Sequence, residues 1–247
     1  METKEKANIL GAHVDIVNAK QTLQKIKKLS KMGEPAHIIT LNAEIVYQAQ
    51  ENPELLNIIN GADLVTPDGI GIVWAGRKLG YPIMERVTGI DLLYQLCAEA
   101  VQQKWRIYFL GAAPGVVEAA AKQLSLAYPG LQICGWHDGY FSDQEVNGVI
   151  HDIKQLKPDL LFVALGAPKQ EFWIKQYKGE LNVPISIGVG GSFDVVAGIK
   201  ERAPQWMIKA NLEWLYRLIT EPSRFQRQLA LPKFAMLVLK QKGKQKI

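Results

Sequence analysis

The sequence predicts an α/β fold, with a mostly parallel, Rossmann-like sheet covered by helices on both faces and a helical appendage at the C-terminus. Three observations favour this class. Short apolar runs alternate with stretches of helical spacing along most of the 247 residues, several of the runs end in glycine, and the alternation stops after Arg202. Continuous apolar strands separated by helices are typical of a parallel sheet that is buried on both faces.

The strands and helices of the predicted sheet follow one another in a regular order. We expect strands at residues 36–40, 62–66, 105–110, 132–136, 160–165 and 184–187, where apolar and β-branched side chains cluster. We expect helices between them, for example at residues 92–103, 116–128 and 143–156. Ser142 or Asp143 is the candidate N-cap of the last of these.

The chain changes character near residue 202, and we divide it into an α/β core, 1–202, and a basic helical appendage, 203–247. Residues 203–247 carry 9 Lys and Arg against 2 acidic residues, while the rest carries 20 against 22. The spacing predicts a helix over 206–219 and a second, amphipathic helix that starts at residues 220–222 and runs to Lys240. This charge indicates an anionic partner, although a solvated, frayed end would look similar.

Composition excludes several classes of protein. Hydrophobic residues make up 48% of the chain, enough for a sizeable core, but no apolar run approaches the roughly 20 residues that span a bilayer. The charged N-terminus lacks a secretory signal, and Cys97 and Cys134 fit no metal spacing, so we expect reduced thiols in a cytosolic protein. Neither the histidines nor any Asp-x-Asp motif offers a metal site, and we expect no cofactor and no metal.

Polar side chains at three predicted strand ends are candidates for catalysis or binding. Asp68, in T-P-D-G-I-G, is a candidate general base, although Pro-Asp-Gly is also ordinary turn or helix-cap chemistry. Thr40 and Asn42 offer hydrogen bonds to a sugar, and the alternative is a helix cap. Arg86 is a candidate phosphate ligand, or else a surface arginine before a helix that Thr88 or Asp91 caps.

Glycine-rich turns at the other strand ends offer backbone N–H groups to an anion. Gly111 and Gly166 each follow a strand, and the block G-V-G-G-S-F contains Gly188, Gly190 and Gly191, which we expect to cradle a diphosphate. Gln170 and Asp194 lie close to these turns in the sequence. The block lacks the last glycine of a dinucleotide fingerprint, and no P-loop is present, so dinucleotide and ATP chemistry are poorly supported.

Taken together and in order, these motifs resemble the WecG/TagA/CpsF glycosyltransferase family. The motifs are T-P-D-G-I-G, R-V-T-G-I-D, F-L-G-A-A-P-G-V, G-Y-F, L-G-A-P-K-Q-E-F-W, G-V-G-G-S-F-D-V-V-A-G and R-A-P, and the resemblance covers residues 9–230. The nearest likeness is to the TagA-type branch of wall teichoic acid synthesis.

The resemblance implies a metal-independent, inverting enzyme on the cytoplasmic face of the membrane. It would move N-acetylmannosamine (ManNAc) from UDP-ManNAc to the C4 hydroxyl of GlcNAc-diphospho-undecaprenol. The resemblance assigns roles to residues of this chain: Asp68 as base, Thr40 and Asn42 lining the pocket, Gln170 near the sugar, Arg86 near the phosphates, and Arg217, Arg224 and Arg227 at the acceptor diphosphate.

Other functions remain open at this point. Sister branches of the family transfer N-acetylmannosaminuronic acid or glucose, and the motifs do not decide among these donors. A different class is a non-catalytic nucleotide-binding module recruited to acidic membranes by the basic C-terminus. We expect no nucleic-acid partner, and the sequence leaves open whether the chain forms a homo-oligomer.

Overall fold

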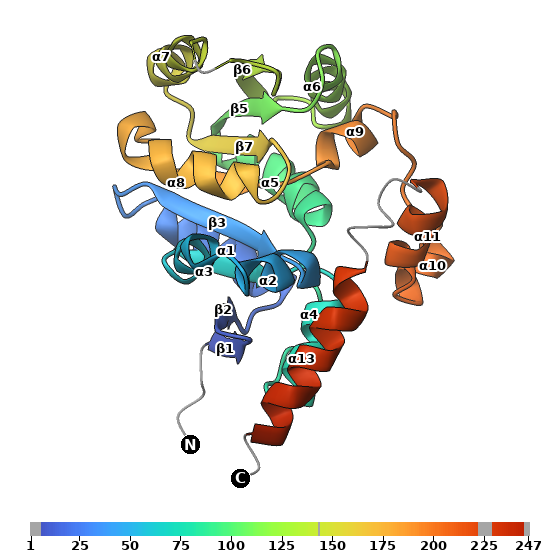
Figure 1. Ribbon diagram of the computed structural model, residues 1–247. Helices are drawn as coiled ribbons and strands as arrows, with labels where there is room; N and C mark the ends of the chain where they lie inside the picture. The colour runs from blue at the N-terminus through green and yellow to red at the C-terminus, as the bar shows by residue number, and fades with distance from the viewer. Residues whose placement is uncertain (1–5, 143, 222–228, 245–247) are drawn as a thin grey trace.

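A parallel sheet of six strands is the centre of the structure (Figure 1). The computed structural model describes residues 6–142, 144–221 and 229–244, without the side chain of Arg217. The strands are β3 (Ala36–Leu41), β4 (Leu64–Pro67), β5 (Arg106–Gly111), β6 (Gln132–His137), β7 (Leu160–Ala164) and β8 (Ile185–Gly188). They lie in the order β4-β3-β8-β7-β5-β6, and every neighbouring pair is parallel. The predicted fold class and all six predicted strands are confirmed.

Helices connect the strands and continue to the C-terminus. They are α1 (Ala19–Leu29), α2 (Ala43–Ala49), α3 (Pro53–Asn60), α4 (Ile70–Lys78), α5 (Gly89–Gln103), α6 (Val116–Ala127), α7 (Val146–Leu156), α8 (Lys169–Leu181), α9 (Ser192–Val196), α10 (Gln205–Lys209), α11 (Glu213–Thr220) and α13 (Ala230–Lys244).

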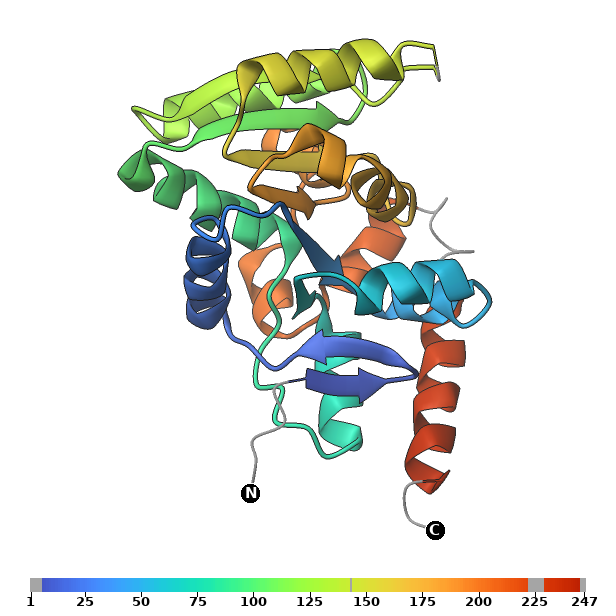
Figure 2. The ribbon, with the colours of Figure 1, turned by 90° about the vertical axis from the view of Figure 1, so that its left-hand side faces the viewer.

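The two faces of the sheet are covered by different helices, because successive strand side chains point to opposite faces. Ile38, Phe109 and Phe162 pack in one core with residues of α1, α5, α6 and α9. Their neighbours Ile39 and Leu110 face the other way, toward α2 and α3 and toward α7 and α8. In Figure 2, α1 and α5 lie on one side of the sheet, and α2, α3 and α8 lie on the other.

An N-terminal hairpin was not predicted from the sequence. Its strands, β1 (Lys6–Ile9) and β2 (Ala12–Asp15), are antiparallel and are joined at Leu10 and Gly11, whose φ angles are 53° and 88°. Two positive φ angles fit a two-residue hairpin turn, but a leucine in the first of these positions hides the usual Asn-Gly signal. Asp15 accepts a hydrogen bond from the backbone N of Val65 at 2.9 Å, which ties the hairpin to β4.

Several helix boundaries differ from the sequence expectation, since α5 begins at Gly89 instead of residue 92 and α13 ends at Lys244 instead of Lys240. The predicted helix 206–219 is divided into α10 and α11, because Asn211 adopts a left-handed φ of 60°. The predicted helix 143–156 begins instead at Val146, with Glu145 at the N-cap position. The candidate cap Ser142 donates from its backbone N and its Oγ to the carboxylate of Glu145, at 2.8 and 2.9 Å. The other candidate, Asp143, lies outside the described residues. Of the predicted helix start at residues 220–222, Thr220 is instead the last residue of α11, and Pro222 lies outside the described residues.

The C-terminal helix α13 packs along α2 and α4 (Figure 1). Phe234 and Val238 are buried in the same apolar cluster as residues of those helices and of the hairpin. Gln241 also accepts a hydrogen bond from the backbone N of Leu10 at 2.9 Å. The division of the chain at residue 202 remains an interpretation, and removing the appendage would expose apolar surface of the core. None of the described helices is both long and apolar enough to span a bilayer.

The packing of α13 predicts a large effect for one substitution. Replacing the buried Phe234 by alanine should lower the free energy of unfolding by about 3–5 kcal/mol, since it removes a ring from a packed core. The matched control is Met236→Ala on the same helix. Met236 is 64% exposed, so its replacement should change stability by less than about 0.5 kcal/mol. Urea unfolding of both variants measures this, and equal effects would show that α13 is not held through Phe234.

Candidate functional site

A pocket of about 1380 Å³ lies at the carboxyl edge of the sheet. Its walls come from the turns after β3, β4, β5, β7 and β8, from α11, and from the start of α13. Open α/β folds bind their ligands at this edge. Most of the residues that the sequence singles out line the pocket: Thr40, Asn42, Asp68, Arg86, Gly166, Gln170, Gly190, Gly191 and Asp194.

Asp68 lies in the turn between β4 and α4, and it does not cap α4. Gly69 occupies the N-cap position of that helix, with a φ of 85°, and no side chain caps it. The backbone N of Asp68 donates to the carbonyl of Leu41 at 2.8 Å, which fixes the turn against the end of β3. Its Oδ2 faces the backbone N of Gly89, at 3.4 Å, at the start of α5. The carboxylate is therefore oriented toward the positive end of a helix in the pocket wall.

Thr40 and Asn42 both have structural partners. Asn42 accepts a hydrogen bond from the backbone N of Ile45 at 3.0 Å and caps α2, which is the alternative that the sequence left open. Thr40 donates from Oγ1 to the carbonyl of Gly188 at 3.1 Å, and so joins the ends of β3 and β8. Thr40 therefore holds the glycine turn in place from one side.

Gln170 holds the same turn from the other side. Its Oε1 accepts a hydrogen bond from the backbone N of Gly190 at 3.0 Å, and its Nε2 donates to Oε1 of Glu171 at 2.8 Å. The N–H of Gly190 is thus already used inside the protein, whereas we expected it to bind a diphosphate. Gly191 also lines the pocket, and it takes no part in the hydrogen bond between Gly190 and Gln170.

Gly111 and Gly188 are outside the pocket lining, and packing explains both. A Cβ atom at Gly188 would lie 2.4 Å from Nε2 of Gln170. A Cβ atom at Gly111 would lie 2.5 Å from the backbone of Ala164 on β7, and Gly111 has a φ of 118°. In both positions glycine allows a close approach inside the protein.

Glu171 is a buried carboxyl group beside the pocket. Its side chain is fully buried, and among the described residues Oε2 has no hydrogen-bond partner. Burial raises the pKa of Glu171 to about 7, and the hydrogen bond from Gln170 opposes that shift. The K-Q-E block draws attention to this residue, but its burial next to Gln170 is a tertiary feature that the sequence does not show.

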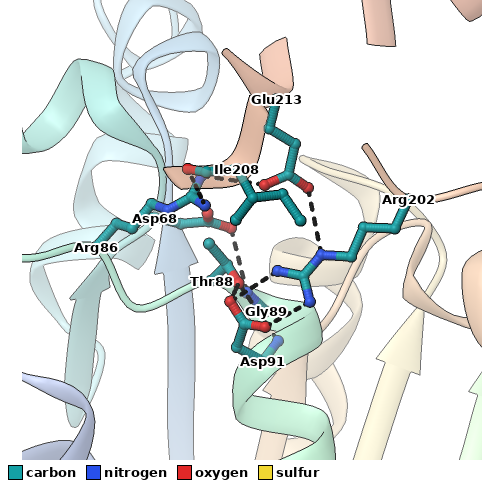
Figure 3. A network of polar contacts seen from close by, with 8 residues as sticks. All are labelled: Asp68, Arg86, Thr88, Gly89, Asp91, Arg202, Ile208 and Glu213. Carbon is teal, nitrogen blue, oxygen red and sulfur yellow. Dashed lines mark hydrogen bonds and ion pairs between the residues drawn. The ribbon is translucent and has the colours of Figure 1, made fainter. Parts of the chain in front are cut away.

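Two arginines join the core to α10 and α11 across the pocket wall (Figure 3). Arg86 contacts Glu213 of α11, with 3.0 Å between Nη1 and Oε2, and donates from Nη2 to the carbonyl of Ile208 at 3.3 Å. Nη1 and Nη2 of Arg202 contact Oδ1 and Oδ2 of Asp91 at 2.7 and 2.9 Å. Nε of Arg202 lies 3.9 Å from Oε1 of Glu213. A two-pronged guanidinium–carboxylate contact of this kind fixes geometry as well as charge.

The start of α5 completes this network. Thr88 is the N-cap, its Oγ1 accepting from the backbone N of Asp91 at 3.3 Å and donating to Oδ2 of Asp91 at 2.6 Å. Burial alone would raise the pKa of Asp91, but the hydrogen bonds from Arg202 and Thr88 outweigh it and leave the pKa below its usual value. Thr88 therefore caps α5, which is one of the two caps that the sequence predicted. Arg86 is a half-buried residue of the pocket wall.

Some predicted residues cannot be placed, and some pocket residues were not predicted. Arg224 and Arg227 lie outside the described residues, as does the side chain of Arg217. Arg202 belongs to the R-A-P motif, but Glu213 is 127 residues away from Arg86, and no local spacing reveals such a pair. Within the described part of the chain, no three His, Cys, Asp or Glu side chains group as metal ligands would.

The sequence matches the model of the Glycosyl transferase WecG/TagA/CpsF family over residues 7–247. The chain belongs to this family. Three relatives carry the name N-acetylglucosaminyldiphosphoundecaprenol N-acetyl-beta-D-mannosaminyltransferase. The relative from Bacillus spizizenii is 42% identical over 83% of this chain and 79% of its own length. Those from Bacillus subtilis and Staphylococcus aureus are 37% and 36% identical over 100% and 97% of this chain, and over 94% of their own lengths. The predicted family is confirmed, and with it the assignment to glycosyltransferases.

The pKa of Glu171 predicts how stability depends on pH. The unfolded chain releases this proton near pH 4.5 and the folded chain near 7, so the folded state binds more protons between these values. The free energy of unfolding should therefore fall by about 3 kcal/mol as pH rises from about 5 to 8, because the buried carboxyl group loses its proton in the folded protein. Glu171→Gln should remove this loss. Urea unfolding of both proteins at pH 5 and pH 8 measures it, and parallel pH profiles would contradict the shifted pKa.

Proposed function

We propose that this protein is an inverting glycosyltransferase that moves ManNAc from UDP-ManNAc to the C4 hydroxyl of GlcNAc-diphospho-undecaprenol. The observation that carries the proposal is the Asp68 carboxylate, which lies in the pocket, does not cap the helix that follows it and faces the start of α5. Membership of the family and the names of the relatives support the choice of donor and acceptor.

The reaction assigns a role to Asp68. Inversion by direct displacement requires a base that removes the proton of the acceptor hydroxyl as its oxygen attacks the anomeric carbon. The new bond joins C4–O of the acceptor to the anomeric carbon, and the bond from that carbon to UDP breaks on the opposite face. Thr40 and Gln170, which hold the glycine turn after β8, are proposed to lie on the donor side of the pocket.

The diphosphate of the donor is proposed to bind near Arg86 and Gly191, which both line the pocket. Because Arg86 already contacts Glu213, a diphosphate that binds there shares this guanidinium with a carboxylate. Asp194, at the start of α9, lies on the same wall and suits a hydroxyl-bearing part of the nucleotide. Asn42 is a wall residue whose side-chain oxygen is used by its cap.

The C-terminal part of the chain is proposed to bring the enzyme to the cytoplasmic face of the membrane, where a lipid-linked acceptor resides. This part of the chain contains several lysines, and some of its large apolar side chains are exposed: Trp206, Trp214, Ile219, Leu229, Met236 and Leu239. Exposed apolar residues flanked by lysines are typical of surfaces that bind anionic lipid. Arg217, Arg224 and Arg227 remain the proposed ligands of the acceptor diphosphate.

The decisive experiment is a transfer assay with several UDP-sugars and a GlcNAc-diphospho-lipid. We expect a disaccharide product with UDP-ManNAc and much less with UDP-GlcNAc, UDP-glucose or UDP-ManNAcA. Preference for one of the last two sugars would assign the chain to a sister branch. Binding of UDP without any transfer would favour the non-catalytic alternative.

Asp68→Asn should lower kcat by roughly 10²–10⁴-fold, since the amide cannot accept the proton of the acceptor hydroxyl. The affinity for UDP, measured by calorimetry, should stay close to that of the wild type. Asp152→Asn is the control, because Asp152 binds the hydroxyl of Tyr108 and is not among the pocket residues. A folded Asp68→Asn variant with near wild-type kcat would remove Asp68 from the base role.

Transfer should proceed without a divalent metal. The sequence has no Asp-x-Asp motif, and Arg86 with the glycine turn is proposed to meet the charge of the diphosphate. Product formation in excess EDTA should therefore equal that in buffer alone. Loss of activity that Mg²⁺ or Mn²⁺ restores would overturn this assignment of the diphosphate site.

A further inference from the structure

The carboxamide of Gln170 has two partners of opposite kind, and together they determine its orientation. An amide oxygen can only accept, and an amide nitrogen can only donate. Gly190 presents an N–H to one end at 3.0 Å, and Glu171 presents a carboxyl oxygen to the other at 2.8 Å. The oxygen of the amide therefore faces the glycine turn, and its nitrogen faces Glu171.

The packing around this amide is tight. Nε2 of Gln170 occupies the space that a side chain at position 188 would need, with only 2.4 Å to an added Cβ, and Gln170 is 2% exposed. From the opposite side, Thr40 donates to the carbonyl of Gly188. The turn after β8 is thus clamped between β3 and the first turn of α8.

A carboxyl group is energetically unfavourable at the buried position of Glu171. It is fully buried, it forms no ion pair among the described residues, and Oε2 has no hydrogen-bond partner there. A buried carboxyl group without a cation is unfavourable compared with an apolar side chain of the same size. Its carboxyl group accepts a hydrogen bond from Gln170. Packing alone does not explain why a carboxyl group occupies this position.

We propose that Glu171 is a positioning residue for the transfer reaction, which accepts one N–H of Gln170 and so directs the second N–H of that amide into the pocket. This inference rests on the proposed function. Among the described residues, Nε2 has Glu171 as its acceptor, which leaves its other N–H for a bound molecule. A group that accepts a hydrogen bond, such as a sugar hydroxyl or the carbonyl of an acetamido group, fits this N–H. Glu171 itself does not line the pocket and acts through Gln170.

The first test measures the orientation of the amide without any reaction. In a ¹H–¹⁵N spectrum of protein labelled at glutamine, the side-chain signals of Gln170 are identified by their loss in Gln170→Ala. One of its two protons should exchange slowly with water in the wild type, because it donates to a buried carboxyl group. That protection should fall at least tenfold in Glu171→Asp, whose shorter side chain withdraws the acceptor, and in Glu171→Met. Unchanged protection in both variants would overturn the proposal.

The second test uses kinetics. Glu171→Met should lower kcat about tenfold or more with little change in the KM for the acceptor, since a misdirected group near the reacting centre costs rate. Glu171→Gln keeps an acceptor oxygen and should restore most of the activity. In a Gln170→Ala background, Glu171→Met should change kcat by less than about twofold, because residues that act through one contact are not additive.

Matched controls separate positioning from stability and from the proposed function. Tyr108→Phe removes a hydrogen bond that another buried side chain donates, to Asp152, and should lower thermal stability without changing kcat. Additive losses for Gln170→Ala and Glu171→Met would mean that Glu171 does not act through Gln170. If the wild type transfers none of the sugars, the proposed function fails. The role of Glu171 is then decided by the exchange measurement and by the double-mutant cycle of Gln170→Ala and Glu171→Met, with the affinity for UDP measured in place of kcat.

Discussion

The ion pairs of Arg86 and Arg202 are the contacts on which the pocket depends. They join the turn before α5 to α11, which is more than a hundred residues away in the sequence. Glu213, which is 7% exposed, lies between the two arginines, so its charge is balanced from both sides. Breaking a pair in such a place leaves a buried charge and costs about 3–5 kcal/mol. Glu213, Trp214 and Leu218 form a wall of the pocket, and that wall exists while these pairs hold α11 in place.

The sheet could be predicted from the sequence because most positions of its strands are apolar. Strands β3, β7 and β8 are buried at every position, and a strand with that burial has a largely apolar sequence with few polar residues. Strand order could not be predicted, since it depends on which helix faces match. The hairpin and the docking of α13 were missed for a related reason. Phe234 is separated from its partners on α2 and α4 by most of the chain, and local spacing carries no information about such contacts.

The candidate site could be predicted in outline because the carboxyl ends of parallel strands meet at one edge. Strand ends bearing Thr40, Asp68, Gln170 and the glycine block were therefore bound to converge. The roles of individual residues were harder to predict, because the same residue type can either support the fold or face the pocket. Asn42 caps a helix and Gly188 makes room for Gln170, whereas Asp68 leaves its helix uncapped. Each of these outcomes depends on which neighbour takes the hydrogen bond or fills the space, and the sequence does not contain that information.

The described residues that line the pocket include more acidic than basic side chains. Among the described residues, six acidic side chains line the pocket, namely Glu44, Asp68, Asp194, Glu201, Glu213 and Glu221, against four basic ones, Arg86, Lys169, Lys200 and Arg202. Three of these four cations contact carboxylates already. A lining of this kind is poorly suited to two diphosphate-bearing substrates unless further positive charge is added.

The proposed function assigns that charge to arginines near the C-terminus. Glu221 and Leu229 both line the pocket, and the sequence between these two residues contains Arg224 and Arg227. Guanidinium groups bind phosphate oxygens in a fork, and they remain charged at any physiological pH. The acceptor diphosphate is therefore proposed to find its counter-charge in these arginines, while the pocket is proposed to supply the base and the walls that orient the sugar.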